Sequence, residues 1–344
     1  MTYKFPKTML AIVGDVELAK EYAEVCDLDF EQTYAFQINP WVSMYNRGLG
    51  LPMDFSAKVE PRDDEHGDKR LDVSTIAASN SLFNLRKFHE AHGFYPKYMF
   101  KDNDRFYSEA GWWDFLGDEI REGRGSNFRA TSLNDSSVAR RRMAELAASW
   151  QANVIAGMGT ASLEAKSGTR VASWAALDAK RIKNGVWFAH QNLGTIDQAQ
   201  QCSDFITVNF YIEGWSDDLT DEQLYERARD ATLCARLVAR NKPVYITVRF
   251  TRAIKSEGYK LPAEMNKLDR IFAGAADGGA YGMMLWDERF PFVEGKPSHE
   301  AAAERMKLAR QHFPEPPKLP RIVVDNSMLE AAAIATAMKG PAQQ

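Results

Sequence analysis

The chain has 344 residues, of which 45% are hydrophobic and 26% are charged. These proportions supply enough apolar side chains for a large core and exclude a wholly disordered chain. Lys and Arg number 43 and Asp and Glu number 47, so the formal net charge is -4. Nucleic-acid-binding proteins usually carry a basic excess, so the sequence predicts no nucleic-acid partner.

The cysteines and the N-terminal residues exclude further classes. The three cysteines lie far apart and form no Cys-x-x-Cys spacing, so we predict no metal site, no disulfide framework and no cofactor. The first apolar run, Met9 to Val13, is too short for a signal peptide, and no stretch approaches the roughly 18 apolar residues of a membrane span. We therefore expect no membrane partner and a location in the cytoplasm or in a virion-type assembly.

From about residue 35 onward, short apolar segments alternate with amphipathic stretches. Several of the short segments are apolar nearly throughout, which is typical of strands buried on both faces of a parallel sheet. The predicted strands are 35–42, 95–102, 128–133, 153–159, 185–192, 204–212, 243–250 and 279–286.

The amphipathic stretches predict helices, several of them with capping residues at their ends. Gly93 ends the first helix, Pro262 falls in a first turn, and Ser298 precedes the last helix. The clearest helix begins at Asp221 and carries one apolar stripe of Leu224, Ala228, Ala231, Cys234, Ala235 and Val238. The predicted helices are 74–93, 112–123, 136–151, 169–184, 195–203, 222–241, 263–279 and 299–313.

This alternation predicts an α/β fold, and specifically a (β/α)8 TIM barrel over residues 35–313. The structural alternative is a doubly wound open sheet. Such a sheet usually carries a glycine-rich phosphate loop after its first strand, and residues 35–48 contain no such loop.

Two segments fall outside the repeat. Residues 1–34 are predicted to form an N-terminal extension packed on the barrel, with a strand from Met9 to Gly14 and a helix from Val16 to Cys26. Residues 314–344 begin as a Pro-rich linker and end in a short strand and an apolar helix, which is marginal without packing. We expect residues 318–344 to dock in a homo-oligomer or a larger protein assembly.

Barrel enzymes carry their active sites at the C-terminal ends of the strands. There this sequence gathers carboxylates, amides and aromatic rings, which suit the apolar faces and hydroxyl rims of a poly- or oligosaccharide. Glycoside hydrolysis requires two carboxylates, one protonated and one ionised. The candidate catalytic residues are Glu213, Asp287 and Asp102. The candidate substrate-binding residues are Trp41, Asp104, His190, Asn192, Tyr211, Arg249, Trp286 and Glu288.

Over residues 33–313 the chain distantly resembles the hyaluronidase family of (β/α)8-barrel glycoside hydrolases. AFQINPWVSMYNRGLGLPMDF and YPKYMFKDNDRFYSEAG resemble the first two strands of that family with their loops. DFITVNFYIEGW, KPVYITVRF and AADGGAYGMMLWDE resemble its last three strands in order and spacing. The resemblance implies that Tyr211 and Trp286 contact the sugar. It also implies that one acid transfers the proton beside an orienting partner, because those enzymes use the acetamido group of the substrate as nucleophile.

The sequence departs from the family where the catalytic acid is expected. The family carries Asp-x-Glu at the end of the strand that follows its third helix. The corresponding segment here, NVIAGMGTASLEA, has Gly, Thr, Ala and Ser at 159–162, and Glu164 lies further on. His190 replaces a tyrosine of the next strand, and the paired cysteines of the family are missing. The resemblance therefore supports the fold and a binding cleft more than it supports catalysis.

Three functions stay open on the sequence alone. The first is a glycoside hydrolase that acts on a polysaccharide. The second is a catalytically inactive barrel that binds glycan or serves as a structural component of an assembly such as a virion or surface appendage. The missing Asp-x-Glu and the apolar tail favour this second function. The third is a lyase or aldolase that uses Lys101, but the charged KDNDR setting offers no apolar burial to lower the pKa of that lysine.

Overall fold

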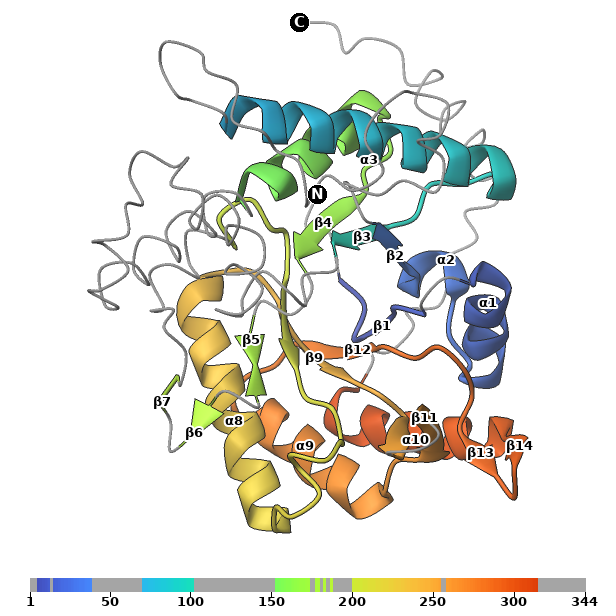
Figure 1. Cartoon of the computed structure of the whole chain (residues 1–344), viewed down its shortest axis with the longest axis vertical. Coiled ribbons are helices and arrows are strands. Elements are labelled where there is room, and N and C mark those ends of the chain that lie inside the picture. Colours follow the sequence, from blue (N-terminus) through green and yellow to red (C-terminus); the bar gives the residue numbers. More distant parts are fainter. Residues whose placement is uncertain are drawn as a thin grey trace, which may run out of the picture. The chain divides into compact units, whose positions relative to one another are not determined.

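A computed structural model describes residues 5–12, 15–38, 70–101, 152–173, 177–179, 182–183, 186–187, 200–254 and 258–314. The chain divides into two compact units, Met1–Pro314 and Glu315–Gln344, and all of the described residues belong to the first unit. That unit is mixed α/β and contains parallel sheets (Figure 1). The predicted strand 128–133, the predicted helices 112–123 and 136–151, and the predicted docking tail lie outside the described residues.

The larger sheet has five strands in the order β1-β12-β9-β8-β5, and all of its pairings are parallel. The predicted strands 204–212, 243–250 and 279–286 are confirmed as β8, β9 and β12. The strand bounds are β1 Thr8–Leu10, β5 Leu177–Asp178, β8 Ile206–Asn209, β9 Val244–Val248 and β12 Gly282–Leu285.

The segment predicted to flank the barrel contributes a strand to this sheet. β1 pairs in parallel with β12, and Met9 lies opposite Met284. The helix predicted after it is confirmed as α1, Val16–Val25, with Asp15 as its N-cap. β1 is therefore a strand of the larger sheet.

A second sheet has three parallel strands in the order β2-β3-β4. Their bounds are β2 Ala35–Ile38, β3 Tyr98–Lys101 and β4 Arg170–Ser173. β2 confirms the start of the predicted strand 35–42, and β3 confirms the later part of the predicted strand 95–102. β4 replaces the first part of the predicted helix 169–184.

Among the described residues, backbone pairing and hydrogen bonds join the two sheets on both sides of the second sheet. An isolated parallel bridge joins Leu10, at the end of β1, to Tyr34, just before β2. On the other side, the backbone N–H of Asp204 donates to the carbonyl of Val171 at 2.7 Å. The N–H of Val171 in turn donates to the Asp204 carboxylate at 2.8 Å. Both sides of the second sheet are thus bonded to the first.

The segment 153–159, predicted as a strand, lies in a helix that spans 152–164. Its buried apolar side chains recur at helical spacing, which a short apolar run does not separate clearly from a strand pattern. They pack against helix α3, Arg70–His92, and the second sheet, and they are Val154, Ile155, Met158 and Ala161.

The chain leaves this helix through two left-handed residues, which explains why β4 follows it directly. Lys166 has φ 51° and Gly168 has φ 66°. The N–H of Ser167 donates to the carbonyl of Ser162 at 3.1 Å, which closes the helix C-terminus. Thr169 then anchors the start of β4, because its hydroxyl donates to the carbonyl of Pro96 at 2.8 Å.

Four further helices follow their local sequence signals. α2 is Phe30–Thr33, α8 is Asp221–Ala239, α9 is Met265–Asp277 and α10 is His299–His312. Thr220 and Gln223 form a capping box at the start of α8, and the predicted apolar stripe of that helix is buried. Ser298 caps α10 as predicted. α8 and α9 lie side by side (Figure 1), and a Cβ on Gly274 would lie only 2.2 Å from the Tyr225 carbonyl.

Short antiparallel hairpins occupy three connections. β6 Ile182–Lys183 pairs with β7 Val186–Trp187, so the described part of the predicted strand 185–192 does not join the parallel sheets. β10 Thr251–Ile254 pairs with β11 Gly258–Pro262, and β13 Phe292–Val293 pairs with β14 Lys296–Pro297. Pro262 therefore ends a strand, and Glu264 is the N-cap of α9.

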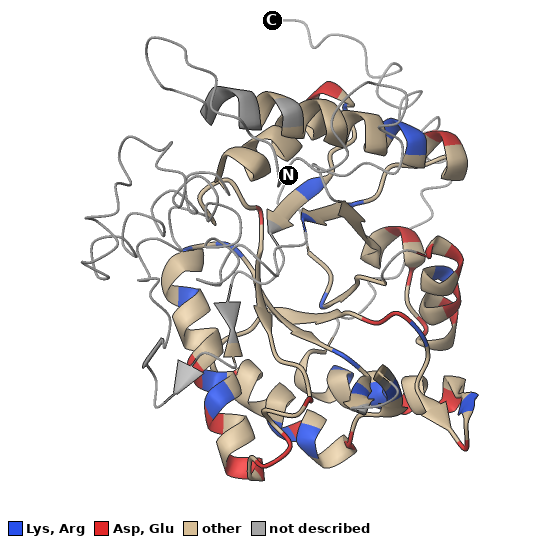
Figure 2. Ribbon diagram, viewed as in Figure 1, with Lys and Arg blue, Asp and Glu red and all other residues tan. Residues whose placement is uncertain are grey.

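The strands separate two apolar layers. Ile246 and Val248 of β9 pack with residues of α1, α8, α9 and α10, which defines a helix-facing side. Tyr245 points to the other side, which we call the inner face. There it packs with strand residues of both sheets, including Met9, Ala35, Phe100, Phe205, Met284 and Trp286. In Figure 2 most charged residues lie on helices and loops, and the strands are largely uncharged.

Within the described residues, no helix combines the length and the apolar character that a membrane span requires.

Two glycine substitutions test the helix at 152–164. A Cβ on Gly157 would lie 2.4 Å from the Ser74 carbonyl, whereas the nearest atom to a Cβ on Gly159 is Val171 Cγ2 at 3.9 Å. We expect Gly157→Ala to lower the free energy of unfolding by about 1–3 kcal/mol through overpacking. Gly159→Ala should raise it by about 0.5–1 kcal/mol, because alanine is the better helix former. Urea unfolding measures both. In a strand these two residues would share one face, so similar effects of the two variants would contradict the helix.

Candidate functional site

Three neighbouring parallel strands, β8, β9 and β12, bring polar and aromatic residues to one edge of the larger sheet. Parallel pairing continues beyond the strand ends. The N–H of Phe210 donates to the carbonyl of Thr247 at 2.8 Å, and the N–H of Trp286 donates to the carbonyl of Val248 at 2.9 Å. Tyr211, Arg249 and Trp286 therefore follow one another across the sheet, on the inner face. We call these three residues the strand-end row.

The guanidinium of Arg249 is the central charge of this row. Its Cζ lies 4.9 Å from the centre of the Tyr211 ring, within range of a cation–π interaction. Arg249 is 8% exposed, and its Nη2 is 4.0 Å from Oε1 of Glu288, which is outside hydrogen-bond range. Four predicted substrate-binding residues, Tyr211, Arg249, Trp286 and Glu288, thus lie on adjacent strand ends.

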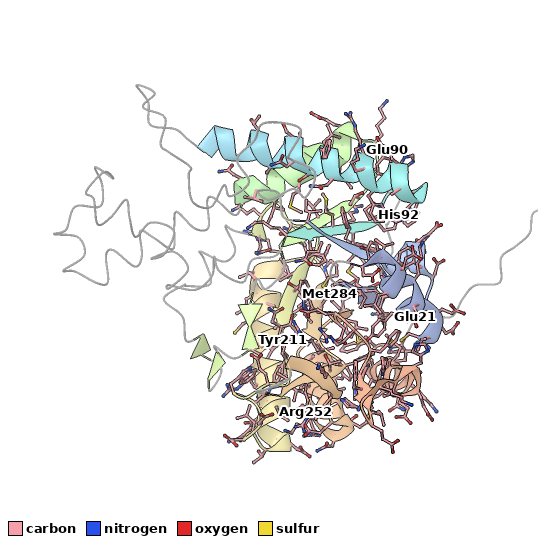
Figure 3. The ribbon with its side chains drawn as sticks, turned by 45° about the vertical axis from the view of Figure 1, so that its right-hand side comes forward. Glu21, Glu90, His92, Tyr211, Arg252 and Met284 are labelled. Atoms are coloured by element: carbon pink, nitrogen blue, oxygen red, sulfur yellow. The ribbon has the colours of Figure 1, made fainter. Side chains whose placement is uncertain are left out.

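Trp286 connects the row to the second sheet. Its indole is 4% exposed and contacts the Phe100 ring edge-on, with 5.6 Å between ring centres. Phe100 belongs to β3, the strand that directly precedes Asp102. Figure 3 labels Tyr211 and Met284, and Met284 is the inner-face residue of β12 below Trp286.

Glu213 follows Tyr211 in a loop that is closed by one buried serine. The N–H of Glu213 donates to Ser216 Oγ at 3.0 Å, and the Ser216 hydroxyl has the carbonyls of Glu213 at 2.9 Å and Tyr211 at 3.3 Å as acceptors. Glu213 is half-buried, and Ser216 is fully buried. This loop fixes the backbone of a predicted catalytic acid beside the strand-end row.

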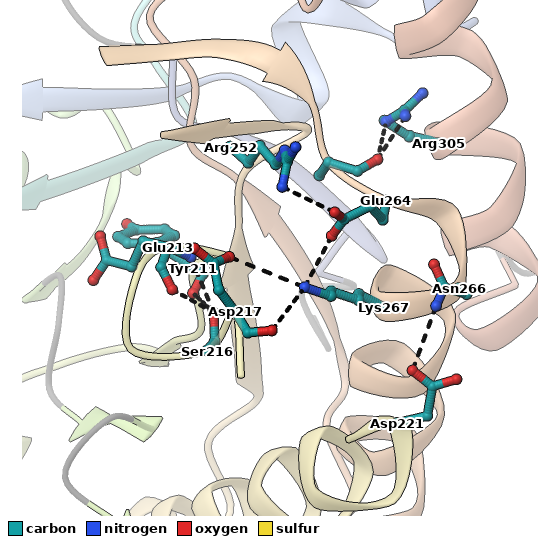
Figure 4. A network of polar contacts seen from close by, with 11 residues as sticks. Tyr211, Glu213, Ser216, Asp217, Asp221, Arg252, Glu264, Asn266, Lys267 and Arg305 are labelled. Atoms are coloured by element: carbon teal, nitrogen blue, oxygen red, sulfur yellow. Dashed lines mark hydrogen bonds and ion pairs between the residues drawn. The ribbon is translucent and has the colours of Figure 1, made fainter. Parts of the chain in front are cut away.

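A polar network fastens the loops after β8 and β9 to the start of α9 (Figure 4). Lys267 Nζ lies 3.1 Å from Glu264 Oε2 and 3.4 Å from the carbonyl of Asp217. Glu264 also pairs with Arg252 of β10 at 2.9 Å. The side chains are about one-third exposed or less, except Asp217, so these contacts hold the two loops that follow strand-end residues.

Asp287 does not lie in the cleft where the sequence placed it. Its side chain is fully buried; it accepts from the backbone N–H of Phe250 at 2.9 Å and from the Thr251 hydroxyl at 2.5 Å. Burial raises the pKa of Asp287 to about 7, although these two hydrogen bonds and Arg249 lower it in part. Asp287 therefore joins the end of β12 to the end of β9, with both of its carboxyl oxygens bonded on the side of the sheet away from the strand-end row.

The surroundings of Asp287 are those of the helix-facing side. The Tyr22 ring of α1 stacks on Phe290 with 4.0 Å between centres, and the Tyr22 hydroxyl donates to the carbonyl of Arg289 at 2.8 Å. Burial and the nearby Asp287 charge raise the pKa of Tyr22 well above its ordinary value. Arg305 of α10 donates through Nε to the carbonyl of Ala263 at 3.0 Å. These groups form a buried polar layer behind the sheet.

Lys101 is also buried, with 1% of its surface exposed, which corrects the expectation of an unburied lysine. It alternates with Phe100 along β3, so it does not share the inner face with the strand-end row. This position argues against a Schiff-base lysine at the site.

The other predicted site residues lie outside the described residues. They are Trp41, Asp102, Asp104, His190 and Asn192. Within the described part of the chain, no group of three or more His, Cys, Asp or Glu side chains is arranged to hold a metal ion.

Sequence reasoning missed Phe100 and Thr247, which lie within strands rather than at their ends. The signal was present, because alternation along a strand places Thr247 on the face of Arg249. Asn209, at the end of β8, is the register partner of Thr247.

Comparisons with known proteins assign the chain to no family. No protein-family profile and no curated protein sequence matches it. Two crystal structures of bee venom hyaluronidase share 11% sequence identity with it. The monoclinic form covers 69% of this chain and 76% of its own, with a TM-score of 0.41. A complex with a hyaluronic acid tetramer covers 61% and 68%, with a TM-score of 0.42. Likeness at this level assigns neither activity nor substrate to this chain.

The pH dependence of stability tests the role of Asp287. Because its folded pKa of about 7 exceeds the ordinary value of 3.8, protonated Asp287 contributes stability that is fully present below pH 3.8. This contribution decreases as the pH rises and is lost above about pH 7. We expect urea unfolding of the wild-type chain to include this decline and unfolding of Asp287→Asn to lack it. Asp218→Asn, at an exposed position, should keep it. A pH-independent difference between wild type and Asp287→Asn would show that folding does not raise the pKa of Asp287.

Proposed function

We propose that the strand-end row is a carbohydrate-binding site and that the chain is a glycoside-hydrolase-like protein acting on a polysaccharide. One observation carries the proposal: buried Arg249 stands at the C-terminal end of a parallel strand whose two neighbours end in Tyr211 and Trp286, and its guanidinium lies 4.9 Å from the Tyr211 ring. Aromatic rings offer flat apolar surfaces with a polar edge, which suit the faces of sugar rings. The guanidinium donates hydrogen bonds that suit hydroxyl and carboxylate groups.

The location supports the same proposal. Ligands of α/β proteins bind at the carboxyl ends of parallel strands, where loops from several strands converge. We also propose that the two sheets belong to one closed barrel. The bonds at Leu10–Tyr34 and Asp204–Val171 support closure, and so does the inner-face core, which contains residues of both sheets.

The proposed acids are Asp102 and Glu213. Asp102 directly follows β3, and Phe100 of that strand contacts Trp286. Glu213 follows Tyr211 in the loop that Ser216 closes. In this proposal one of the two protonates the glycosidic oxygen and the other stabilises or activates the attacking group. Asp287 is not among the proposed acids, because it is bonded to Phe250 and Thr251.

The burial of Asp287 also favours a second candidate function, which is glycan binding without hydrolysis. The strand-end row is sufficient for binding, whereas cleavage needs a correctly placed acid in addition. The two functions make the same prediction for Trp286 and different predictions for the acids.

The proposal is tested with neutral polysaccharides (dextran, xylan), chitin oligosaccharides and uronic-acid polymers (hyaluronic acid, alginate), scoring binding and reducing-end release separately. We expect Trp286→Ala to weaken binding about tenfold or more, because it removes the stacking surface. If the chain is a hydrolase, Asp102→Asn or Glu213→Gln should lower the rate by about 10²–10⁴-fold without loss of binding.

Two controls separate function from folding. Trp215→Ala removes a half-buried indole that packs on Phe210 at the helix-facing side, and it should leave binding intact. Asp287→Asn should change stability and not the chemical step. Binding without release by the wild-type chain would establish the second candidate function. No binding to any polysaccharide would refute both.

A further inference from the structure

Two buried polar side chains lie one layer below the strand-end row. Asn209 is the last residue of β8 and Thr247 lies in β9; they are register partners in the parallel pair. Both belong to the inner face, because their strand neighbours Ile206, Val208, Ile246 and Val248 pack on the helix-facing side. Asn209 is 5% exposed and Thr247 is fully buried.

Neither side-chain oxygen is satisfied. Asn209 Oδ1 and Thr247 Oγ1 make no hydrogen bond to any group of the chain as the structure describes it. Two other buried threonine hydroxyls do have partners: Thr232 Oγ1 donates to the carbonyl of Ala228 at 2.8 Å, and Thr251 Oγ1 donates to Asp287. A buried polar atom without a partner destabilises a fold, because its lost hydrogen bonds to water are not replaced. The oxygens of Asn209 and Thr247 therefore lower the stability of the folded chain.

The residues next to Asn209 and Thr247 show that the pair lies on the side of the strand-end row. Met284 is the register partner of Thr247 on β12, and it is fully buried. Tyr211, Arg249 and Trp286 continue the same three strands toward their C-terminal ends. The pair is therefore the polar part of the layer directly below the proposed carbohydrate site.

We propose that Asn209 and Thr247 form a hydrogen-bonding subsite that takes a hydroxyl group of the bound sugar. Neighbouring strands are about 4.8 Å apart, so one oxygen atom between them can lie about 2.8 Å from both side chains. The amide oxygen of Asn209 accepts a hydrogen bond, and the Thr247 hydroxyl both donates and accepts. A hydroxyl group, which also donates and accepts, satisfies both at once. This inference rests on the proposed carbohydrate function. It names a hydroxyl group of the sugar as the group that the site would recognise.

Thr247→Val and Asn209→Ala test the subsite on the polysaccharide of the panel that the wild-type chain binds most tightly. Valine keeps the shape of threonine and removes the unsatisfied hydroxyl. We expect Thr247→Val to keep or raise the thermal stability of the chain and to weaken polysaccharide binding about tenfold. Asn209→Ala should weaken binding to a similar extent.

Thr232→Val is the matched control, because Thr232 is equally buried but bonded to Ala228 on the helix-facing side. It should lower thermal stability and leave binding unchanged. The subsite is overturned if Thr247→Val lowers stability as Thr232→Val does, or if Thr247→Val and Asn209→Ala bind as the wild type does while Trp286→Ala does not. Failure of the proposed function gives a different result, because the wild-type chain itself then binds no polysaccharide. That result refutes the sugar subsite as well.

Discussion

Successive residues of a β-strand point to opposite faces of the sheet, and this constraint separates two kinds of chemistry at the ends of β9 and β12. Arg249 and Trp286 continue the inner face, whereas Phe250 and Asp287, the next residues, lie on the helix-facing side. There the Asp287 carboxylate binds the Phe250 N–H and so fixes the end of one strand against the end of the other. This bond lies behind the strand-end row, to which Asp287 itself does not belong.

The parts of the fold that the sequence predicts correctly are those whose signals are local. β8, β9 and β12 are continuous apolar runs, and α8 and α10 begin at capping side chains with an apolar stripe behind them. The sequence predicts a strand at Met9 but not its place in the larger sheet, because β1 is three residues long and its partner β12 lies near the other end of the chain. The segment 153–159 was assigned to a strand because a few apolar residues interrupted by glycine fit both periods, and only packing against α3 and the second sheet decides between them.

The candidate site shows the same division. Tyr211, Arg249, Trp286 and Glu288 could be predicted because strand ends are recognisable wherever the strand itself is. Asp287 is a catalytic candidate by its chemical type, whereas its face of the sheet follows from a one-residue step that composition does not reveal. Thr247 was missed for the converse reason: a threonine inside an apolar strand looks structural, and only the absence of a bonding partner among the described residues marks it as unusual.

The two faces of the sheet also differ in how their buried polar groups are satisfied. On the helix-facing side, Asp287 accepts two hydrogen bonds and Arg305 donates to backbone carbonyls, so the bonds that these groups lose with water are replaced within the protein. On the inner face, Asn209 and Thr247 lack such replacements, and they lie directly below aromatic rings and a guanidinium. The sugar hydroxyl proposed above would complete their bonds. Binding and hydrolysis would both use these groups, and they differ only in whether an acid such as Asp102 or Glu213 reaches the glycosidic oxygen.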